Sequence, residues 1–180
     1  MRGKSHTCLG HYLADHYMPT VPNRYRLAFL LGCIEPDRNP ATYLKGSLRC
    51  QWLRGHNYLN AQNYMDKVAR RLERKQKLRL LDYYALGKLI HYTTDAFTSA
   101  HNNTFPEALD IHREYEAGLQ DYFLSYMANR PSLPQTDGNS IMQAIRRYHR
   151  DYIRRPTHIR TDSRFALLAC CSVMAVLMPV

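Results

Sequence analysis

The sequence lacks three features that would place it in a common class of protein. Its most apolar stretch, residues 165–180, is shorter than the ~20 residues that span a bilayer. No apolar run follows the basic residues at its start, so we expect a cytoplasmic protein, with secretion or membrane association as the alternative if residues precede Met1. Its five cysteines include no CxxC pair, and their odd number argues against a disulfide framework.

Acidic residues are scarce beside basic ones, with 15 Asp and Glu against 25 Lys and Arg and a formal net charge of +10 at pH 7. Such an excess suits anionic partners, namely phosphate esters, phospholipid headgroups or nucleic acid. A solvated basic surface is an equally weighted alternative. Apolar residues make up 45% of the 180-residue chain, which is enough for one packed core. We therefore expect a single domain over residues 1–180.

Alternating runs of β-branched residues are also scarce, and apolar positions recur at helical spacing. We predict an all-α, single-domain bundle of about six or seven helices. The predicted helical segments are residues 8–18, 24–32, 57–79, 82–100, 107–128, 139–153 and 161–178. Leu86, Leu89, Ile90 and Phe97 form the apolar face of the fourth segment, which should therefore pack in the core.

Loop and cap residues give further local expectations. Residues 33–46 contain two prolines and a glycine, which predicts an irregular loop that carries Asp37. Asp82 is a candidate N-cap for its helix, and Thr161 or Asp162 for the last helix. The last helix contains the adjacent Cys170 and Cys171 in an apolar setting, which indicates a buried helix, with a membrane-associated tail as the less favoured alternative.

Two carboxylate–histidine pairs stand on successive predicted helices. His91 and Asp95 are four residues apart, as are His112 and Glu116, so each pair projects from one helix face. His101 lies between the pairs. Imidazole and carboxylate ligands suit Zn²⁺, and helical bundles often build metal sites from such pairs. One such pair alone is more often an ion pair or a surface hydrogen bond than a metal site. For two pairs, the spacing alone gives equal weight to a metal site and to ordinary ion pairs or hydrogen bonds.

The order of these residues extends the pattern. The stretch GKLIHYTTDAFTSAHNNTFPEALDIHREYEAGL resembles the zinc-dependent phospholipase C family of bacteria, which carries His-x3-Asp-x5-His followed by His-x3-Glu. Three segments, KSHTCLGHYLADHYM, LGCIEPDRNP and RGHNYL, resemble the histidine-bearing start, the Gly-x-x-x-Pro-Asp loop and the next histidine segment of that family. The resemblance covers about residues 4–125, and its all-α fold agrees with the helical pattern.

The resemblance implies a role for each matching residue. Seven would hold zinc: His56, His91 and Asp95 the first ion, His101, His112 and Glu116 the second, and His6 with bridging Asp95 a third. Asp37 would orient or deprotonate the attacking water. Secreted members complete the third site with an N-terminal Trp, whereas residue 1 here is Met, so the sequence supports two ions better than three. His11 and His16 compete with His6 as candidate ligands.

The resemblance implies a zinc-dependent phosphodiester hydrolase of the phospholipase C type, acting on a phospholipid or another phosphate ester. One alternative is a zinc-dependent nuclease or nucleotidase, because single-strand-specific zinc nucleases have a similar ligand order and the charge of +10 suits nucleic acid. Another is a non-catalytic, metal-stabilised module that binds a membrane or a partner. The basic segment 67–79 could contact anionic lipid, although a solvated helix face is the preferred interpretation.

Overall fold

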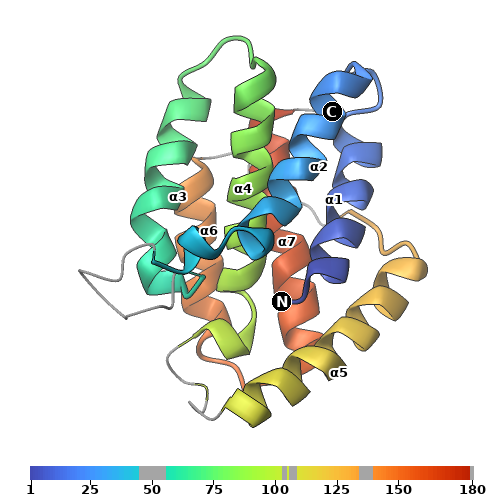
Figure 1. Ribbon diagram of the computed structural model, residues 1–180, viewed down its shortest axis with the longest axis vertical. Helices are drawn as coiled ribbons and strands as arrows, with labels where there is room; N and C mark the ends of the chain where they lie inside the picture. Colours follow the sequence, from blue (N-terminus) through green and yellow to red (C-terminus); the bar gives the residue numbers. More distant parts are fainter. Residues whose placement is uncertain (45–55, 103–104, 106–108, 134–139, 179–180) are drawn as a thin grey trace.

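A computed structural model describes residues 1–44, 56–102, 105, 109–133 and 140–178. Over these residues the protein has seven α-helices, two short 3-10 helices and no strand, which confirms the all-α prediction. The elements are α1 (Gly3–Tyr17), α2 (Asn23–Arg38), η1 (Pro40–Leu44), α3 (Tyr58–Glu73), α4 (Leu80–Ala96), η2 (Ser99–His101), α5 (Leu109–Ala128), α6 (Ile141–Tyr152) and α7 (Ile159–Leu177). Figure 1 shows α1 to α4 along the long axis, with α5 slanting across the lower end.

Helix α4 lies at the centre of the bundle, in contact with α2, α3 and α7. The residues predicted as its apolar face, together with Phe97 just after its end, are at most 1% exposed, which confirms that prediction. Burial continues on the other faces, so His91 and Asp95 are both 0% exposed. A polar pair this deep needs partners from neighbouring elements, and these partners come from the ends of the surrounding helices.

Two glycines set the distance between α2 and α4. A Cβ atom at Gly32 would clash with the carbonyl oxygen of Tyr84, and one at Gly87 would clash with that of Phe29. Only glycine permits two helix backbones to approach so closely. This contact fixes α2 against α4 a little more than one turn before Asp37 and His91, so it also positions these two side chains relative to each other.

Helix α2 continues through Pro36 to Arg38, so the predicted loop from residue 33 is wrong at its start. A proline inside a helix removes one hydrogen bond, but Pro36 lies in the last turn and is buried. Packing of α2 on α4 outweighs this local preference. Asp37 therefore lies on the last turn of a helix and not on a loop, which fixes its direction more firmly.

Several predicted helix ends are also wrong. Helix α1 begins at Gly3, before the predicted residue 8, and α3 ends at Glu73, before the predicted residue 79. Asp82 is the third residue of α4, where its side chain accepts a hydrogen bond from the backbone N–H of Arg79, the true N-cap. Asp162 is likewise inside α7, whose N-cap is His158. Both acidic side chains are buried because they bind groups from other segments.

Helix α7 packs in the core, as predicted. Cys170, Cys171, Val173 and Met174 are each 0% exposed. Four cysteines are described and all four are free thiols, in keeping with the expected absence of a disulfide framework. Among the described helices, none is both long enough and apolar enough to cross a membrane.

Candidate metal centre

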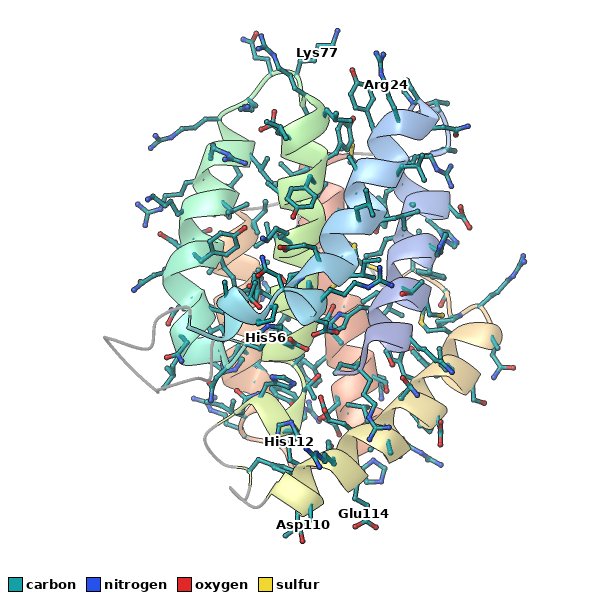
Figure 2. All side chains as sticks on the ribbon, viewed as in Figure 1. Arg24, His56, Lys77, Asp110, His112 and Glu114 are labelled. Atoms are coloured by element: carbon teal, nitrogen blue, oxygen red, sulfur yellow. The ribbon has the colours of Figure 1, made fainter. Side chains whose placement is uncertain are left out.

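The eight predicted site residues form one connected cluster in which neighbouring ligand atoms are at most 3.8 Å apart. They come from six elements or their edges: His6 from α1, Asp37 from α2, His56 from the residues before α3, His91 and Asp95 from α4, His101 from η2, and His112 and Glu116 from α5. In Figure 2, His56 and His112 lie in the lower half of the bundle, far from Arg24 and Lys77 at the other end.

The first group in the cluster has two histidines and two carboxylates. His56 Nδ1 and His91 Nε2 are 3.2 Å apart. Asp95 Oδ2 lies 3.2 Å from His56 Nδ1 and 3.3 Å from His91 Nε2. Asp37 Oδ1 lies 3.6 Å from each of these nitrogens. Four potential ligand atoms therefore face one small volume.

The outer nitrogens of both histidines show which inner nitrogens carry lone pairs. His91 Nδ1 lies 2.9 Å from the carbonyl oxygen of Cys33, which can only accept, so Nδ1 is the protonated nitrogen. His56 Nε2 lies 3.0 Å from Thr42 Oγ1, and that hydroxyl has the carbonyl oxygens of Pro36 and Asn39 as its acceptors. His56 Nε2 is therefore the donor to Thr42. Both inner nitrogens then present lone pairs to the same volume, an arrangement typical of metal-binding histidines.

The other oxygen of Asp95 faces a second set of groups. Asp95 Oδ1 lies 3.2 Å from His6 Nε2 and accepts a 2.7 Å hydrogen bond from the amino group of Met1. The carbonyl oxygen of Met1 lies 3.1 Å from His6 Nε2. The two oxygens of Asp95 thus point to two different clusters of ligand atoms, as a bridging carboxylate requires.

The remaining predicted ligands form a third group nearer the surface. His101 Nε2 lies 3.1 Å from Glu116 Oε1, and His112 Nε2 lies 3.5 Å from Glu116 Oε2. The amino group of Met1 reaches this group too, 2.9 Å from His101 Nε2 and 3.0 Å from Glu116 Oε1. His112 is the most exposed of the three ligands, at 31%, so this group opens toward solvent.

Charge and burial in the centre keep Asp95 ionised and His6 neutral, the states that a metal requires, but they keep the Met1 amino group protonated. Burial alone would raise the pKa of Asp95, but nearby positive charge, from a protonated His101 and from the Met1 amino group, holds that pKa well below its usual value. Burial and the neighbouring His91 lower the pKa of His6 to about 4. Burial would lower the pKa of the Met1 amino group, but Asp95 and Glu116 raise it to about 10. Ionised carboxylates and neutral imidazoles are the forms that bind a cation.

The donor set fits zinc. Three groups, each with ligand atoms within 4.8 Å of one another, could hold an ion: His6, His91 and Asp95; Asp37, His56 and His91; and His101, His112 and Glu116. All of these side chains offer nitrogen or oxygen ligands, which Zn²⁺ takes in tetrahedral sites. Asp37 appears here among the candidate ligands, in addition to the proton-handling role that the sequence resemblance implies.

A cleft of about 410 Å³ lies on the other side of Asp37. Its lining residues are Gly3, Lys4, Thr7, Ile34, Asp37 and Arg38. Asp37 Oδ2 lies 3.6 Å from where a Cβ atom of Gly3 would stand, so one oxygen of this carboxylate faces the histidines and the other faces the cleft. A molecule in the cleft would therefore be next to the metal centre.

Sequence reasoning missed two contributors to the centre and left two choices open. The missed contributors are Thr42 and the carbonyl oxygen of Cys33, which orient the two central histidines. No sequence pattern marks these partners, so their roles needed the folded arrangement. The role of residue 1 was the first open choice, and the amino group and carbonyl oxygen of Met1 lie beside Asp95 and His6. His11 and His16 are exposed, so of the three histidines of α1 only His6 belongs to the centre.

Comparison with known proteins agrees with this arrangement. The model of the family described as zinc dependent phospholipase C matches residues 5–164. Comparisons with curated proteins and with solved structures give no further match. The family match includes all eight site residues and extends beyond the residues that carried the sequence resemblance. The chain therefore belongs to the zinc-dependent phospholipase C family.

Proposed function

We propose that the protein hydrolyses a phosphodiester, most simply a phospholipid, with zinc held in this centre. One observation carries the proposal. The lone pairs of His56 Nδ1 and His91 Nε2 face each other at 3.2 Å, with a carboxylate oxygen of Asp95 beside both. Two imidazole nitrogens and a carboxylate oxygen that converge on one buried volume are Lewis bases, and a cation placed among them would be bound by all three. A metal ion is the partner that suits all of them.

Each zinc ion would have its own ligand group. His56, His91 and Asp95 would hold the first, with Asp37 beside it, and His101, His112 and Glu116 the second. A third ion would need His6, the other oxygen of Asp95, and the amino group and carbonyl oxygen of Met1. That last set lies together only in a chain whose first residue is Met1, and its amino group would have to lose the proton it carries here.

The chain's own groups then account for the remaining chemistry. Bound zinc supplies positive charge for the phosphoryl oxygens and lowers the pKa of a coordinated water to about 7. Asp37 is the most exposed of the three carboxylates, at 24% against 16% for Glu116 and 0% for Asp95. It can therefore accept the proton of the attacking water and release it to solvent. Attack at phosphorus would break its bond to the glycerol oxygen, which takes a proton from solvent and leaves as diacylglycerol, while the phosphate stays on the headgroup.

Two assays on the same purified protein test this proposal. We expect bound zinc and metal-dependent hydrolysis of a short-chain phospholipid, with single-stranded DNA as the comparison substrate. Turnover of DNA in preference to phospholipid would favour the nuclease alternative. Bound zinc without turnover of either substrate would favour the non-catalytic module, and both results would contradict the proposed activity.

The charges that line the cleft beside Asp37 support a proposal about the headgroup. Lys4 and Arg38 place two cations on its lining against the one carboxylate of Asp37, and none of its described lining residues is aromatic. Quaternary ammonium headgroups are bound by aromatic side chains, whereas cations suit an anionic headgroup.

We expect kcat/KM to be about threefold to tenfold higher for a phosphorylated inositol headgroup than for phosphocholine, since exposed ion pairs contribute about 0.2–1 kcal/mol each. The measurement uses short-chain lipids below their critical micelle concentration, so that adsorption of the basic protein to a lipid surface does not contribute to kcat/KM.

A charge-reversal pair separates the cleft from overall charge. The double variant Lys4→Glu/Arg38→Glu should lose this preference. The double variant Arg24→Glu/Lys77→Glu makes the same change in net charge at the opposite end of the bundle (Figure 2) and should keep it. Equal loss in both variants would show that only net charge matters, and no preference in the unmodified protein would contradict the assignment of the cleft.

A further inference from the structure

The C-terminal third of the chain, which carries no recognised motif, supplies a buried carboxylate to the region behind the second ligand group. Asp162 of α7 is 0% exposed. Its Oδ1 accepts hydrogen bonds from the hydroxyls of Ser99 at 2.9 Å and Tyr152 at 2.8 Å. Its Oδ2 accepts from the backbone N–H of Ser99 at 2.8 Å and from the hydroxyl of Tyr115 at 2.9 Å.

Two of these donors stand next to proposed zinc ligands. Ser99 is the first residue of η2, a 3-10 helix of one turn that ends at His101. Tyr115 directly precedes Glu116 on α5. Asp162 therefore ties η2 and α5 to the same side chain, and these are the elements that bring His101 and Glu116 to within 3.1 Å of each other.

A second contact holds the other end of the turn. Asn102 follows His101 and donates hydrogen bonds to the carbonyl oxygens of Ala96 and Thr98, at 3.0 and 2.9 Å. Its side-chain oxygen lies 2.9 Å from Nε2 of His149, which is on α6. The turn that carries His101 is thus held on both sides by helices of the C-terminal third.

Stability alone does not account for a carboxylate at this position. Burying a charge is costly unless it is fully hydrogen-bonded, and a hydrophobic side chain would fill similar space at lower cost. The four described hydrogen-bond donors to Asp162 are all neutral, so hydrogen bonds and not an opposite charge stabilise the carboxylate. The two oxygens of Asp162 accept these bonds in fixed directions, and they can therefore hold two separate segments in one geometry.

We propose that Asp162 is a positioning residue that fixes His101 and Glu116, and so sets the zinc affinity of the His101–His112–Glu116 group. This inference rests on the proposed zinc centre. Outer groups that orient metal ligands typically change metal affinity by about 10–100-fold. Because Asp162 acts through Ser99 and Tyr115, we expect the lower end of that range.

The test is a zinc titration against a competing chelator, using Asp162→Asn and a matched control. Asparagine keeps the shape of the side chain but turns an NH2 group toward two donors, which breaks the network. Asp82→Asn is the control, because Asp82 is a buried carboxylate of α4 that binds Lys75 and the backbone of Arg79, away from the centre. Both variants should unfold at lower temperature, but only Asp162→Asn should weaken one zinc ion, by about tenfold.

A double variant shows which ion is affected. Since His112→Ala already removes a ligand of the same group, adding Asp162→Asn should not weaken the remaining ions further. If Asp162→Asn does not fold, Tyr115→Phe removes the hydroxyl that α5 donates to Asp162 and should weaken the same ion by a smaller factor. Unchanged zinc affinity in Asp162→Asn would overturn the positioning role. If only Tyr115→Phe folds, unchanged zinc affinity in that variant would overturn it instead.

The unmodified protein separates this inference from the proposed function. If the unmodified protein binds zinc, failure of the positioning role leaves the proposed function intact. If it binds no zinc, the positioning role and the proposed function are both overturned.

Discussion

Replacing His91 with alanine should empty the first ligand group and abolish turnover. His91 Nε2 contacts every other member of that group, at 3.2 Å from His56 Nδ1, 3.3 Å from Asp95 Oδ2 and 3.6 Å from Asp37 Oδ1. A water in the cavity left by the substitution would be a weaker ligand than the imidazole, whose orientation the carbonyl oxygen of Cys33 fixes. Loss of metal removes several kcal/mol of charge stabilisation, which is about a thousandfold or more in rate. Elemental analysis and kcat on one preparation measure both effects.

The control for this variant is His11→Ala, which removes an exposed imidazole from α1. Its zinc content and kcat should stay unchanged. Circular dichroism should show that both variants keep their helices, since the bundle has an extensive apolar core apart from the centre. Unchanged zinc content in His91→Ala would remove this residue from the ligand set, whatever happened to the rate.

Replacing Asp37 with asparagine should separate catalysis from metal binding. The amide oxygen can still bind a cation, but it cannot accept a proton at neutral pH. We therefore expect zinc content to be kept and kcat to fall by about 100- to 10,000-fold, the range for a lost general base. Zinc content and kcat are again measured together.

A matched control stands on the same helix. Glu35→Gln makes the same carboxylate-to-amide change two residues away, but the Glu35 side chain pairs with Lys88 at 2.7 Å and accepts from Asn39 at 2.7 Å. Its loss should lower stability modestly and leave kcat near that of the parent. Full activity in Asp37→Asn would exclude Asp37 from the mechanism. Loss of zinc in that variant would instead show that Asp37 acts mainly as a ligand.

The local part of the site could be predicted from the sequence because it depends on helix geometry. Residues four apart on a helix share a face whatever the tertiary structure, so the pair of His91 and Asp95 and the pair of His112 and Glu116 could each be placed correctly. The same spacing predicted a helix with an apolar face around Leu86 and Leu89, although not its place at the centre of the bundle.

The other parts depend on contacts between distant segments. Asp37 was expected on a loop because Pro36 usually ends a helix, and only the close packing of Gly32 on Gly87 shows why α2 continues. Thr161 and Asp162 are both candidates to cap α7 because threonine and aspartate favour that position, but Asp162 binds Ser99, which lies 63 residues earlier. Local propensity cannot report such partners, since tertiary packing overrides it.

The most direct test of the zinc centre is the metal content of the unmodified protein. Purified chain that has been loaded with zinc and dialysed against metal-free buffer should retain at least two zinc ions per chain by elemental analysis. Two ions would match the groups built on His91 and Glu116, and a third would add the group built on His6 and Met1. Fewer than one ion per chain would contradict the metal centre, and with it the proposed hydrolase.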